Sequence, residues 1–203
     1  MSKVAGYKHG RVPRVIREKQ ILDIAEQQFI LMGYESTTVE SVRLAAGVSR
    51  PIIYEYYGSK DDLYLACAKR VREQYETCLI EIWNHEVPFE ESMQKASNLY
   101  FSLIEENPKR WQILFSGTSA PMSGELGEKL RLLRKKTIDL MKDRLQNMTS
   151  DVDPERADAF SHAIFAIGDH LGQWWLNNPN IPKFRVVGHH VAFIKSGLSD
   201  LLK

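Results

Sequence analysis

Residues 37–63, TTVESVRLAAGVSRPIIYEYYGSKDDL, constrain the fold most because they contain several predicted helix starts in close succession. Thr37 and Glu40 fit a capping box, in which each side chain satisfies a free backbone N–H of the other residue. Ser49 is a typical N-cap residue, and Pro51 suits the first turn of a helix, where no backbone N–H is needed. The stretch therefore predicts two short helices, beginning near residues 38 and 50.

A further helix is predicted to begin after Ser59, since Asp62 follows in its first turn and a carboxylate there complements the positive end of a helix. Between the two short helices stands Ala46-Gly47-Val48. Gly47 can adopt the positive φ that ends a helix abruptly. Two short helices joined by such a turn are typical of a helix-turn-helix.

The second helix of this motif is predicted to have an inner and an outer face. Ile53 and Tyr57 are placed to pack inward, whereas the outer side chains combine a cation, apolar atoms and phenolic hydroxyls. That combination suits base edges, thymine methyl groups and phosphate oxygens. We expect Arg50 and Ile52 to contact bases. The full set of candidate DNA contacts is Thr37, Thr38, Arg43, Ser49, Arg50, Pro51, Ile52, Tyr54, Tyr56 and Lys60.

Residues 14–70 resemble the DNA-binding domain of the TetR family of transcriptional regulators. The matching elements are Ile21-Leu22, Ala25, Phe29, Gly33-Tyr34, Thr37-Thr38-Val39, Ala46-Gly47-Val48-Ser49, Tyr54, Tyr56-Tyr57, Ser59-Lys60-Asp61 and Leu63. Two positions depart from the family pattern, since Arg43 replaces a usual alanine and Gly58 a frequent proline. Arg43 either reaches a phosphate or extends along the helix surface.

The resemblance implies an all-α protein with a three-helix DNA-binding domain, residues 14–70, and a helical ligand-binding and dimerisation domain, residues 71–203. It further implies a homodimer formed through the last two helices and a near-palindromic double-stranded DNA operator. Two-fold symmetry would place the recognition helices roughly 34 Å or more apart. The family's usual member is a repressor, released when a small apolar or aromatic effector shifts the long helix that begins near residue 59.

Charge is distributed unevenly along the chain, although the net charge is only +1. Residues 1–60 hold nine Lys and Arg against six Asp and Glu, whereas the remaining residues hold eighteen against twenty. A basic arm over residues 1–13 fits phosphate contact. A solvated tail explains the same composition, so both interpretations stay open.

The two cysteines, Cys67 and Cys78, lie on one predicted helix and on the same face of it. At the rise of a helix they stand ~16 Å apart, which exceeds the ~7 Å limit between Cα atoms in a disulfide. We therefore expect two buried, reduced thiols, with a thiol sensor as the alternative. No targeting signal and no apolar run of ~18 residues is present, which predicts a cytoplasmic protein without a membrane partner.

The second domain is predicted to form helices over residues 90–106, 109–115, 125–148, 153–177 and 182–202. Small residues four apart in the sequence, at 159 and 163 and again at 168 and 172, allow close approach of neighbouring helices. We interpret them as part of the dimer interface, although a core helix explains them too. Aromatic and polar side chains in this domain predict an effector cavity rather than only a core. The candidates are Tyr100, Trp111, Phe115, His162, Phe165, Asp169 and Trp174.

Catalysis and metal binding receive little support. Four histidines, at 162, 170, 189 and 190, lie near Asp169 in the sequence, yet neither H-E-x-x-H nor Cys-x-x-Cys is present. The chain also lacks G-x-S-x-G, a phosphate loop and a dinucleotide fingerprint. We therefore expect no catalytic residue, no metal and no cofactor. The two rival hypotheses are a helical protein-interaction module and an all-helical enzyme that uses the cavity of the second domain.

Overall fold

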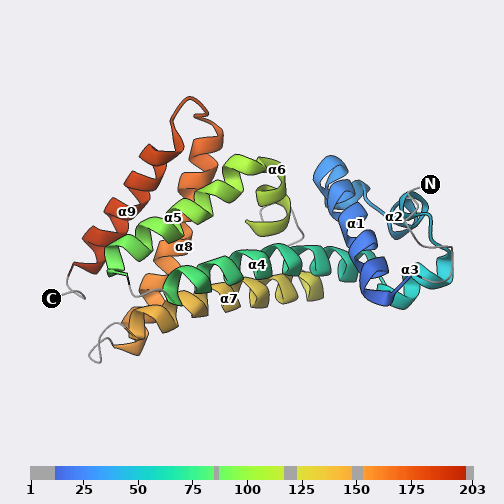
Figure 1. Ribbon diagram of the computed structural model, residues 1–203, viewed down its shortest axis with the longest axis horizontal. Helices are drawn as coiled ribbons and strands as arrows, with labels where there is room; N and C mark the ends of the chain where they lie inside the picture. The colour runs from blue at the N-terminus through green and yellow to red at the C-terminus, as the bar shows by residue number, and fades with distance from the viewer. Residues whose placement is uncertain (1–11, 85–86, 117–122, 148–152, 200–203) are drawn as a thin grey trace. The chain divides into compact units, whose positions relative to one another are not determined.

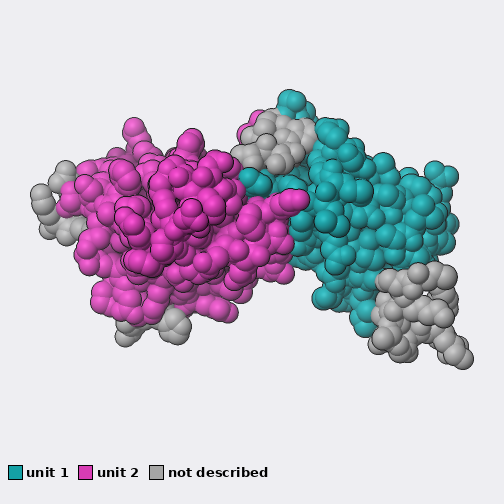
Figure 2. All heavy atoms as spheres, turned by 90° about the horizontal axis from the view of Figure 1, so that it is seen from above, with its two compact units in different colours: residues 1–71, 112–130 teal, residues 72–111, 131–203 magenta. Residues whose placement is uncertain are grey.

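The computed structural model describes residues 12–84, 87–116, 123–147 and 153–199, which form helices and contain no strand (Figure 1). The predicted all-α class is confirmed. The chain groups into two compact units, residues 1–71 with 112–130, and residues 72–111 with 131–203 (Figure 2). The predicted division near residue 70 differs in assigning residues 112–130 to the second domain. Most of the predicted basic arm lies outside the described residues.

Unit 1 contains α1 (Arg14–Ser36), α2 (Val39–Ala46), α3 (Arg50–Tyr56) and the first part of α4 (Lys60–Asn84). Its core is formed by apolar side chains that recur at helical spacing and are fully or almost fully buried. They include Ile21, Ala25, Phe29, Val42, Val48, Ile53 and Leu63. α2 packs against both α1 and α3. α1 is kinked at Gly33, whose φ of +78° breaks the helical geometry close to the predicted stop.

The cap of α2 lies one residue later than the sequence predicts. Thr38, not Thr37, is the N-cap: its Oγ1 accepts from the N–H of Ser41 at 3.0 Å, and its own N–H donates to Ser41 Oγ at 3.2 Å. Thr37 is buried, and its hydroxyl donates to the Gly33 carbonyl at 2.8 Å. Two adjacent threonines offer the same hydroxyl, so the local pattern did not distinguish them.

The other predicted helix boundaries of unit 1 agree with the structure. Gly47 ends α2 with φ of +65°, and Ser49 begins α3, although its side chain makes no capping hydrogen bond. The N–H of Asp62 donates to Ser59 Oγ at 3.0 Å, as predicted for the start of α4. Of the two cysteines on α4, Cys67 is buried as predicted, whereas the prediction for Cys78 was wrong because it is exposed; both are free thiols.

Unit 2 is built mainly from α5 (Phe89–Glu106), α8 (Pro154–Leu176) and α9 (Lys183–Leu198), each packed against the other two. The remaining elements are α6 (Pro108–Arg110), the π-helix η1 (Trp111–Phe115) and α7 (Gly124–Gln146). Trp111 belongs to unit 2 and the rest of η1 to unit 1, whereas α7 begins in unit 1 and continues in unit 2. Asn107 and Asp153 cap α6 and α8 through their side-chain oxygens. The helix predicted over residues 109–115 is therefore a short α-helical turn followed by a π-helix.

Two glycines of α8 allow close packing within one chain. An added Cβ at Gly168 would lie 3.4 Å from both His190 and Tyr100. At Gly172 it would lie 2.6 Å from Ile104 and 3.0 Å from Trp111. The small residues at 168 and 172 thus serve packing against α5, η1 and α9, which corrects their predicted role in a dimer interface. Ala159 and Ala163, the other small pair, are exposed.

No helix within the described ranges combines the length and the apolar character needed to cross a lipid bilayer.

Gly172→Ala is expected to lower the free energy of unfolding by about 1–3 kcal/mol, because the new methyl group overpacks a site whose neighbours Ile104 and Trp111 are almost fully buried. Gly188→Ala is the matched control, since nothing lies within 4 Å of the added Cβ. Denaturant unfolding of both variants measures the difference. Equal stability of the two would show that α8 moves freely away from α5.

Candidate DNA-binding surface and ligand cavity

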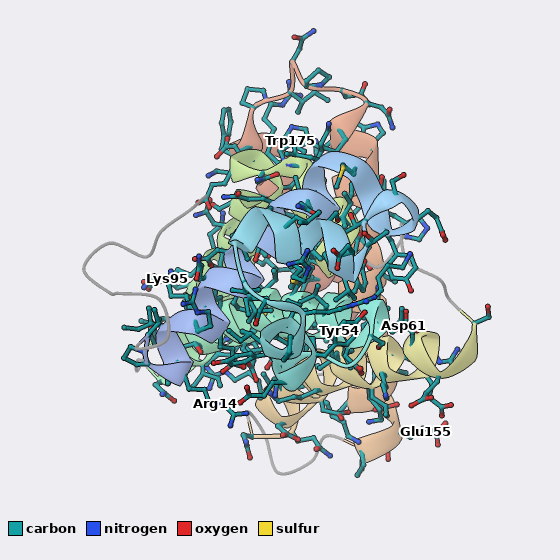
Figure 3. All side chains as sticks on the ribbon, turned by 90° about the vertical axis from the view of Figure 1, so that its right-hand side faces the viewer. Arg14, Tyr54, Asp61, Lys95, Glu155 and Trp175 are labelled. Carbon is teal, nitrogen blue, oxygen red and sulfur yellow. The ribbon has the colours of Figure 1, made fainter. Side chains whose placement is uncertain are left out.

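The surface of α3 is divided as the sequence predicts. Ile53 and Tyr57 are buried, whereas Arg50, Pro51 and Tyr54 are exposed, and 45% of Tyr54 remains accessible. The Tyr54 side chain is labelled in Figure 3. Ser49 is also exposed, and Ile52 and Tyr56 are half-buried. The outer face therefore presents a guanidinium group, a proline ring and a phenol next to each other. Arg50 can donate to guanine or to phosphate, and the apolar atoms can contact a thymine methyl group.

Tyr56 connects this face to the beginning of α1. Its hydroxyl donates to the Arg14 carbonyl at 3.3 Å, and the Arg14 guanidinium lies 5.6 Å from the centre of its ring. Arg14 itself is exposed, so it adds a cation next to the outer face of α3. Arg14 follows the predicted basic arm directly and was not among the predicted DNA contacts.

Lys60 has a structural contact that the sequence analysis missed. Its Nζ donates to the carbonyls of Tyr34 and Glu35, at 3.2 and 3.3 Å, and lies 4.2 Å from the centre of the Tyr34 ring. These carbonyls belong to the end of α1, where free acceptors remain. Lys60 therefore ties the end of α1 to the start of α4. The signal available in the sequence was a glycine near the end of one helix and a lysine at the start of a later helix.

Arg43 joins α2 to the following turn. Its guanidinium forms an ion pair with Glu40 at 2.7 Å and donates to the Val48 carbonyl at 2.9 Å. The hydrogen bond to Glu40 is the main cause that raises the pKa of Arg43. Of the two interpretations left open, the structure supports a role along the helix surface. Thr37, also a candidate, is buried and cannot contact DNA directly, whereas Thr38 is exposed.

A small cavity of about 20 Å³ lies within unit 2. This volume holds about one water molecule and is far below the range typical for ligand sites, so a larger ligand must move the walls apart. Its wall is mostly apolar and comes from α4, α5, α7, α8 and α9. The lining residues are Tyr75, Met93, Ala96, Ser97, Tyr100, Met141, Ile164, Phe165, Gly168, His190 and Ile194. A cavity lined by one polar pair and several apolar side chains suits a mostly apolar ligand.

Two of the predicted ligand residues, Tyr100 and Phe165, line this cavity. Trp111 is buried beside Tyr100, with ring centres 6.4 Å apart, but is not part of the wall. His162 and Trp174 do not line this cavity, since both are exposed on α8. Apolar residues occur on most of the circumference of α8, so the sequence did not indicate which side of this helix faces inward.

The remaining two predicted ligand residues also lie outside the cavity wall. Phe115 is buried in η1 and groups with unit 1, whereas the cavity belongs to unit 2. Asp169 is half-buried behind Tyr100, whose hydroxyl donates to it. Asp169 therefore contacts a residue of the cavity wall, Tyr100, but not the cavity itself.

A polar network surrounds Asp169 and Tyr100. Arg134 of α7 forms an ion pair with Asp169. Burial is the largest cause that raises the pKa of Tyr100, followed by the nearby charge of Asp169. The Tyr100 phenol is therefore neutral and keeps its proton for the hydrogen bond. These contacts link α5, α7 and α8 on one side of the cavity.

The same side of unit 2 contains a second set of buried polar groups. Thr137 of α7 donates to Glu76 of α4 at 2.8 Å, and Arg72 reaches the Thr137 hydroxyl at 3.4 Å. Lys136 pairs with Glu76 at 2.8 Å. Burial lowers the pKa of Arg72 to about 10, which still leaves the guanidinium charged at neutral pH. Such groups are stable in a core only when they are paired.

His190 supplies the polar pair of the cavity wall together with Ser97. Its Nδ1 lies 3.0 Å from Ser97 Oγ, and its Nε2 lies 3.2 Å from the Ile164 carbonyl. The sequence analysis considered His190 only as a metal ligand. Among the residues that the structure describes, no group of three or more His, Cys, Asp and Glu side chains is arranged to hold a metal ion. The adjacent His189 is exposed.

Residues 21–67 match the family model described as bacterial regulatory proteins of the tetR family. The HTH-type transcriptional activator FasR of Mycolicibacterium smegmatis is 25% identical over 192 residues, which cover 94% of this chain and 87% of the relative. The HTH-type transcriptional repressor Rv1474c of Mycobacterium tuberculosis is 38% identical over 58 residues, or 29% of this chain and 31% of the relative. The names of both relatives describe regulators rather than enzymes.

The fold matches solved structures of the same kind. The transcriptional regulator FadR from Bacillus subtilis, solved in complex with stearoyl-CoA, superposes with a TM-score of 0.75 at 19% sequence identity; the match covers 88% of this chain and 98% of that one. A TetR-like regulator from Rhodococcus sp. RHA1 superposes with a TM-score of 0.71 at 22% identity, over 93% of this chain and 99% of that one. Residues 21–67 therefore carry the helix-turn-helix that the tetR family model describes, and the chain has the same fold as the solved regulators.

Proposed function

We propose that this protein binds a near-palindromic operator as a homodimer and is released from it when an apolar effector fills the cavity of unit 2. The observation that carries the proposal is the outer face of α3, where Arg50, Pro51 and Tyr54 are exposed while the inner face is buried. In this proposal residues 14–70 form the DNA-binding domain and residues 71–203 the effector-binding and dimerisation domain.

We assign the proposed DNA contacts according to which side chains already have partners within the protein. Arg50 has no ion pair in the part of the chain that the structure describes, so its fork of donors is available for guanine or phosphate. Thr38, Ser49 and Tyr54 are exposed and suit phosphate contacts. Lys60 is bound to the end of α1, so we assign it mainly to holding the domain together.

The homodimer is proposed to form through α8 and α9. Both helices expose small and apolar side chains that the described residues leave uncovered. On α8 these are Ala159, Ala163, Ala166 and Trp174, and on α9 they are Phe184, Ala192 and Phe193. Exposed apolar surface of this kind is typical of interaction sites. A two-fold axis there would present two copies of α3 to one operator.

The effector is proposed to be mostly apolar. The wall of the cavity supports this, since it is mostly apolar. Its Ser97 and His190 are hydrogen-bonded to each other, and Tyr100 donates to Asp169 behind it. The structurally similar FadR of Bacillus subtilis was solved with stearoyl-CoA, so an acyl chain is one apolar ligand that fits the proposal. One matching relative is named as an activator and another as a repressor. We propose that this protein is a repressor, which the effector releases from DNA.

A route from cavity to DNA-binding domain runs along η1. Tyr100, part of the cavity wall, contacts Trp111 edge to face at 6.4 Å. Two residues further along the chain, the Ile113 carbonyl accepts from the Tyr64 hydroxyl within unit 1. The Tyr64 ring packs against Phe29 at 5.0 Å. A ligand that displaces Tyr100 therefore acts on η1, and η1 acts on the core of unit 1. π-Helices are frequent at functional sites.

Fluorescence anisotropy on tiled DNA fragments that flank the gene of this protein tests the proposal. The expected result is one preferred fragment, bound by two chains or a multiple of two, with affinity that falls as salt rises. Equally weak binding to all fragments at low salt, without salt dependence, would favour the protein-interaction module. Turnover of a small molecule by the purified protein would favour the enzyme.

Arg50→Ala is expected to weaken operator binding by about 1–3 kcal/mol and to relax the preference for one base pair, because a bidentate donor is lost. Lys95→Ala is the control, since it removes one positive charge from α5 in unit 2 and should leave operator affinity unchanged. Anisotropy on the operator and on single-base variants measures both effects. Wild-type affinity and base preference in Arg50→Ala would contradict the proposed reading face.

Tyr64→Phe is expected to reduce the effect of the ligand on operator affinity about threefold to tenfold, because it removes one hydrogen bond to Ile113 and keeps the ring. Affinities for DNA alone and for ligand alone should change little. The control is Tyr34→Phe, which removes a hydroxyl bonded to Asp61 in the same aromatic cluster. If the coupling is unchanged in Tyr64→Phe, or reduced equally in both variants, the route along η1 is wrong.

A further inference from the structure

The polar pair of the cavity wall has a fixed arrangement of hydrogens. The Ile164 carbonyl can only accept, so Nε2 of His190, 3.2 Å away, carries the ring hydrogen. Burial is the main cause that lowers the pKa of His190, and the hydrogen bond to Ile164 acts in the opposite direction. The imidazole is therefore neutral at pH 7, and its Nδ1 is an acceptor. It follows that the Ser97 hydroxyl, 3.0 Å from Nδ1, is the donor of that hydrogen bond.

Ser97 is thereby left with acceptor capacity only. A hydroxyl has one hydrogen and two lone pairs, and the hydrogen is used by His190. Within the described ranges, His190 is the one hydrogen-bond partner of Ser97 Oγ, and the serine is 4% exposed. A buried oxygen with free lone pairs lacks the hydrogen bonds that water would give it. Ser97 thus favours a partner that donates.

The Tyr100 hydroxyl, which is also on the wall, does not compensate. Tyr100 donates its hydrogen to Asp169, so it too offers no free hydrogen to the cavity. The walls around these groups are apolar, formed by Met93, Ile164 and Ile194 among others. A ligand group that only accepts, such as an ether or a carboxylate, would place lone pairs against lone pairs. A ligand group that donates would complete the hydrogen bonding of Ser97.

We propose that Ser97, oriented by His190, determines the specificity of the cavity and selects an apolar effector that carries a hydroxyl group. This inference rests on the proposed function of the cavity as an effector site and names the chemical class of its ligand. His190 is a positioning residue, since it fixes the direction of the Ser97 hydrogen. The apolar walls contact the hydrocarbon part of the ligand and do not select its exact structure.

The test compares two series of probes: alcohols, whose hydroxyl group can donate a hydrogen bond, and their methyl ethers, in which a methyl group replaces that hydrogen. Straight-chain alkanols from hexanol to tetradecanol are titrated against the full-length protein alongside the methyl ether of each alkanol, with tryptophan fluorescence or calorimetry as the readout. Wild type is expected to bind the best alkanol about tenfold more tightly than its ether, the ratio of a single well-formed hydrogen bond. Equal affinity for both, or no binding of either series, would overturn the proposal.

Variants of α5 assign that preference to Ser97. Ser97→Ala should reduce the ratio between alkanol and ether to about one, and Ser97→Thr, which keeps the hydroxyl, should retain it. Ser92→Ala is the matched control, because Ser92 is a buried serine on the same helix whose hydroxyl donates to the Phe89 carbonyl away from the cavity wall. Thermal unfolding verifies that each variant is folded. A preference that persists in Ser97→Ala would assign the recognition to another group.

Operator binding is measured in parallel on wild type with each probe. A preference for alkanols that depends on Ser97 but leaves operator affinity unchanged would support the specificity of the cavity and contradict its role as an effector site. If the protein binds its operator specifically but binds neither series of probes, its function as a regulator is supported and the inference about Ser97 is overturned.

Discussion

The burial of Ile53 and Tyr57 beneath α3 is the constraint on which the DNA-binding surface depends. Both side chains are almost fully removed from solvent, and burial of the Ile53 side chain alone is worth about 1.5–3 kcal/mol. Because the inner face is fixed, the opposite face with Arg50 and Tyr54 must point outward. Gly47 makes the arrangement feasible, since its φ of +65° ends α2 and allows the chain to turn.

Polar contacts then hold this short motif in place. Arg43 donates to the carbonyl of Val48 in the turn, and Lys60 donates to carbonyls at the end of α1. Arg43 also pairs with Glu40, and Lys60 lies over the Tyr34 ring; in addition, both side chains satisfy backbone acceptors near helix ends. The basic residues of the motif therefore fall into two groups. Arg50 is available to the DNA, whereas Arg43 and Lys60 stabilise the scaffold that presents it.

The second unit solves a different problem, because it must keep a cavity within a packed set of helices. Close packing of α8 against α5, through Gly168 and Gly172, brings Tyr100 and His190 to the cavity wall. Buried ionic groups such as Arg72 and Glu76 lie outside that wall, and their partners come from other helices. A cavity enclosed by apolar walls and bordered by a paired polar network can accept a ligand without leaving charges unpaired.

Local signals in the sequence were sufficient for the helix-turn-helix. Gly47, Pro51 and the Ser59 cap act over a few residues, so their effects could be predicted before any packing was known. Thr37 and Thr38 show the limit of this approach, since two equivalent hydroxyls compete and tertiary burial selects the cap. The same limit applies to Lys60, whose partners lie 25 and 26 residues away in the sequence.

The ligand cavity was less predictable for a related reason. Periodicity identifies the apolar stripe of a helix but does not distinguish a side that faces the core from one that faces another molecule. His162 and Trp174 were assigned to the cavity and lie on the exposed side of α8, whereas Ser97 and His190 were overlooked. A hydrogen bond between residues 93 positions apart leaves no pattern in a single sequence.

The central claim is that two copies of α3 read one operator, and hydroxyl-radical footprinting of the protein on its preferred DNA fragment tests it most directly. The account predicts two protected patches related by two-fold symmetry, with centres about one helical turn apart, or ~34 Å, or a multiple of that distance. A single protected patch, or two patches without the symmetry of the site, would contradict it.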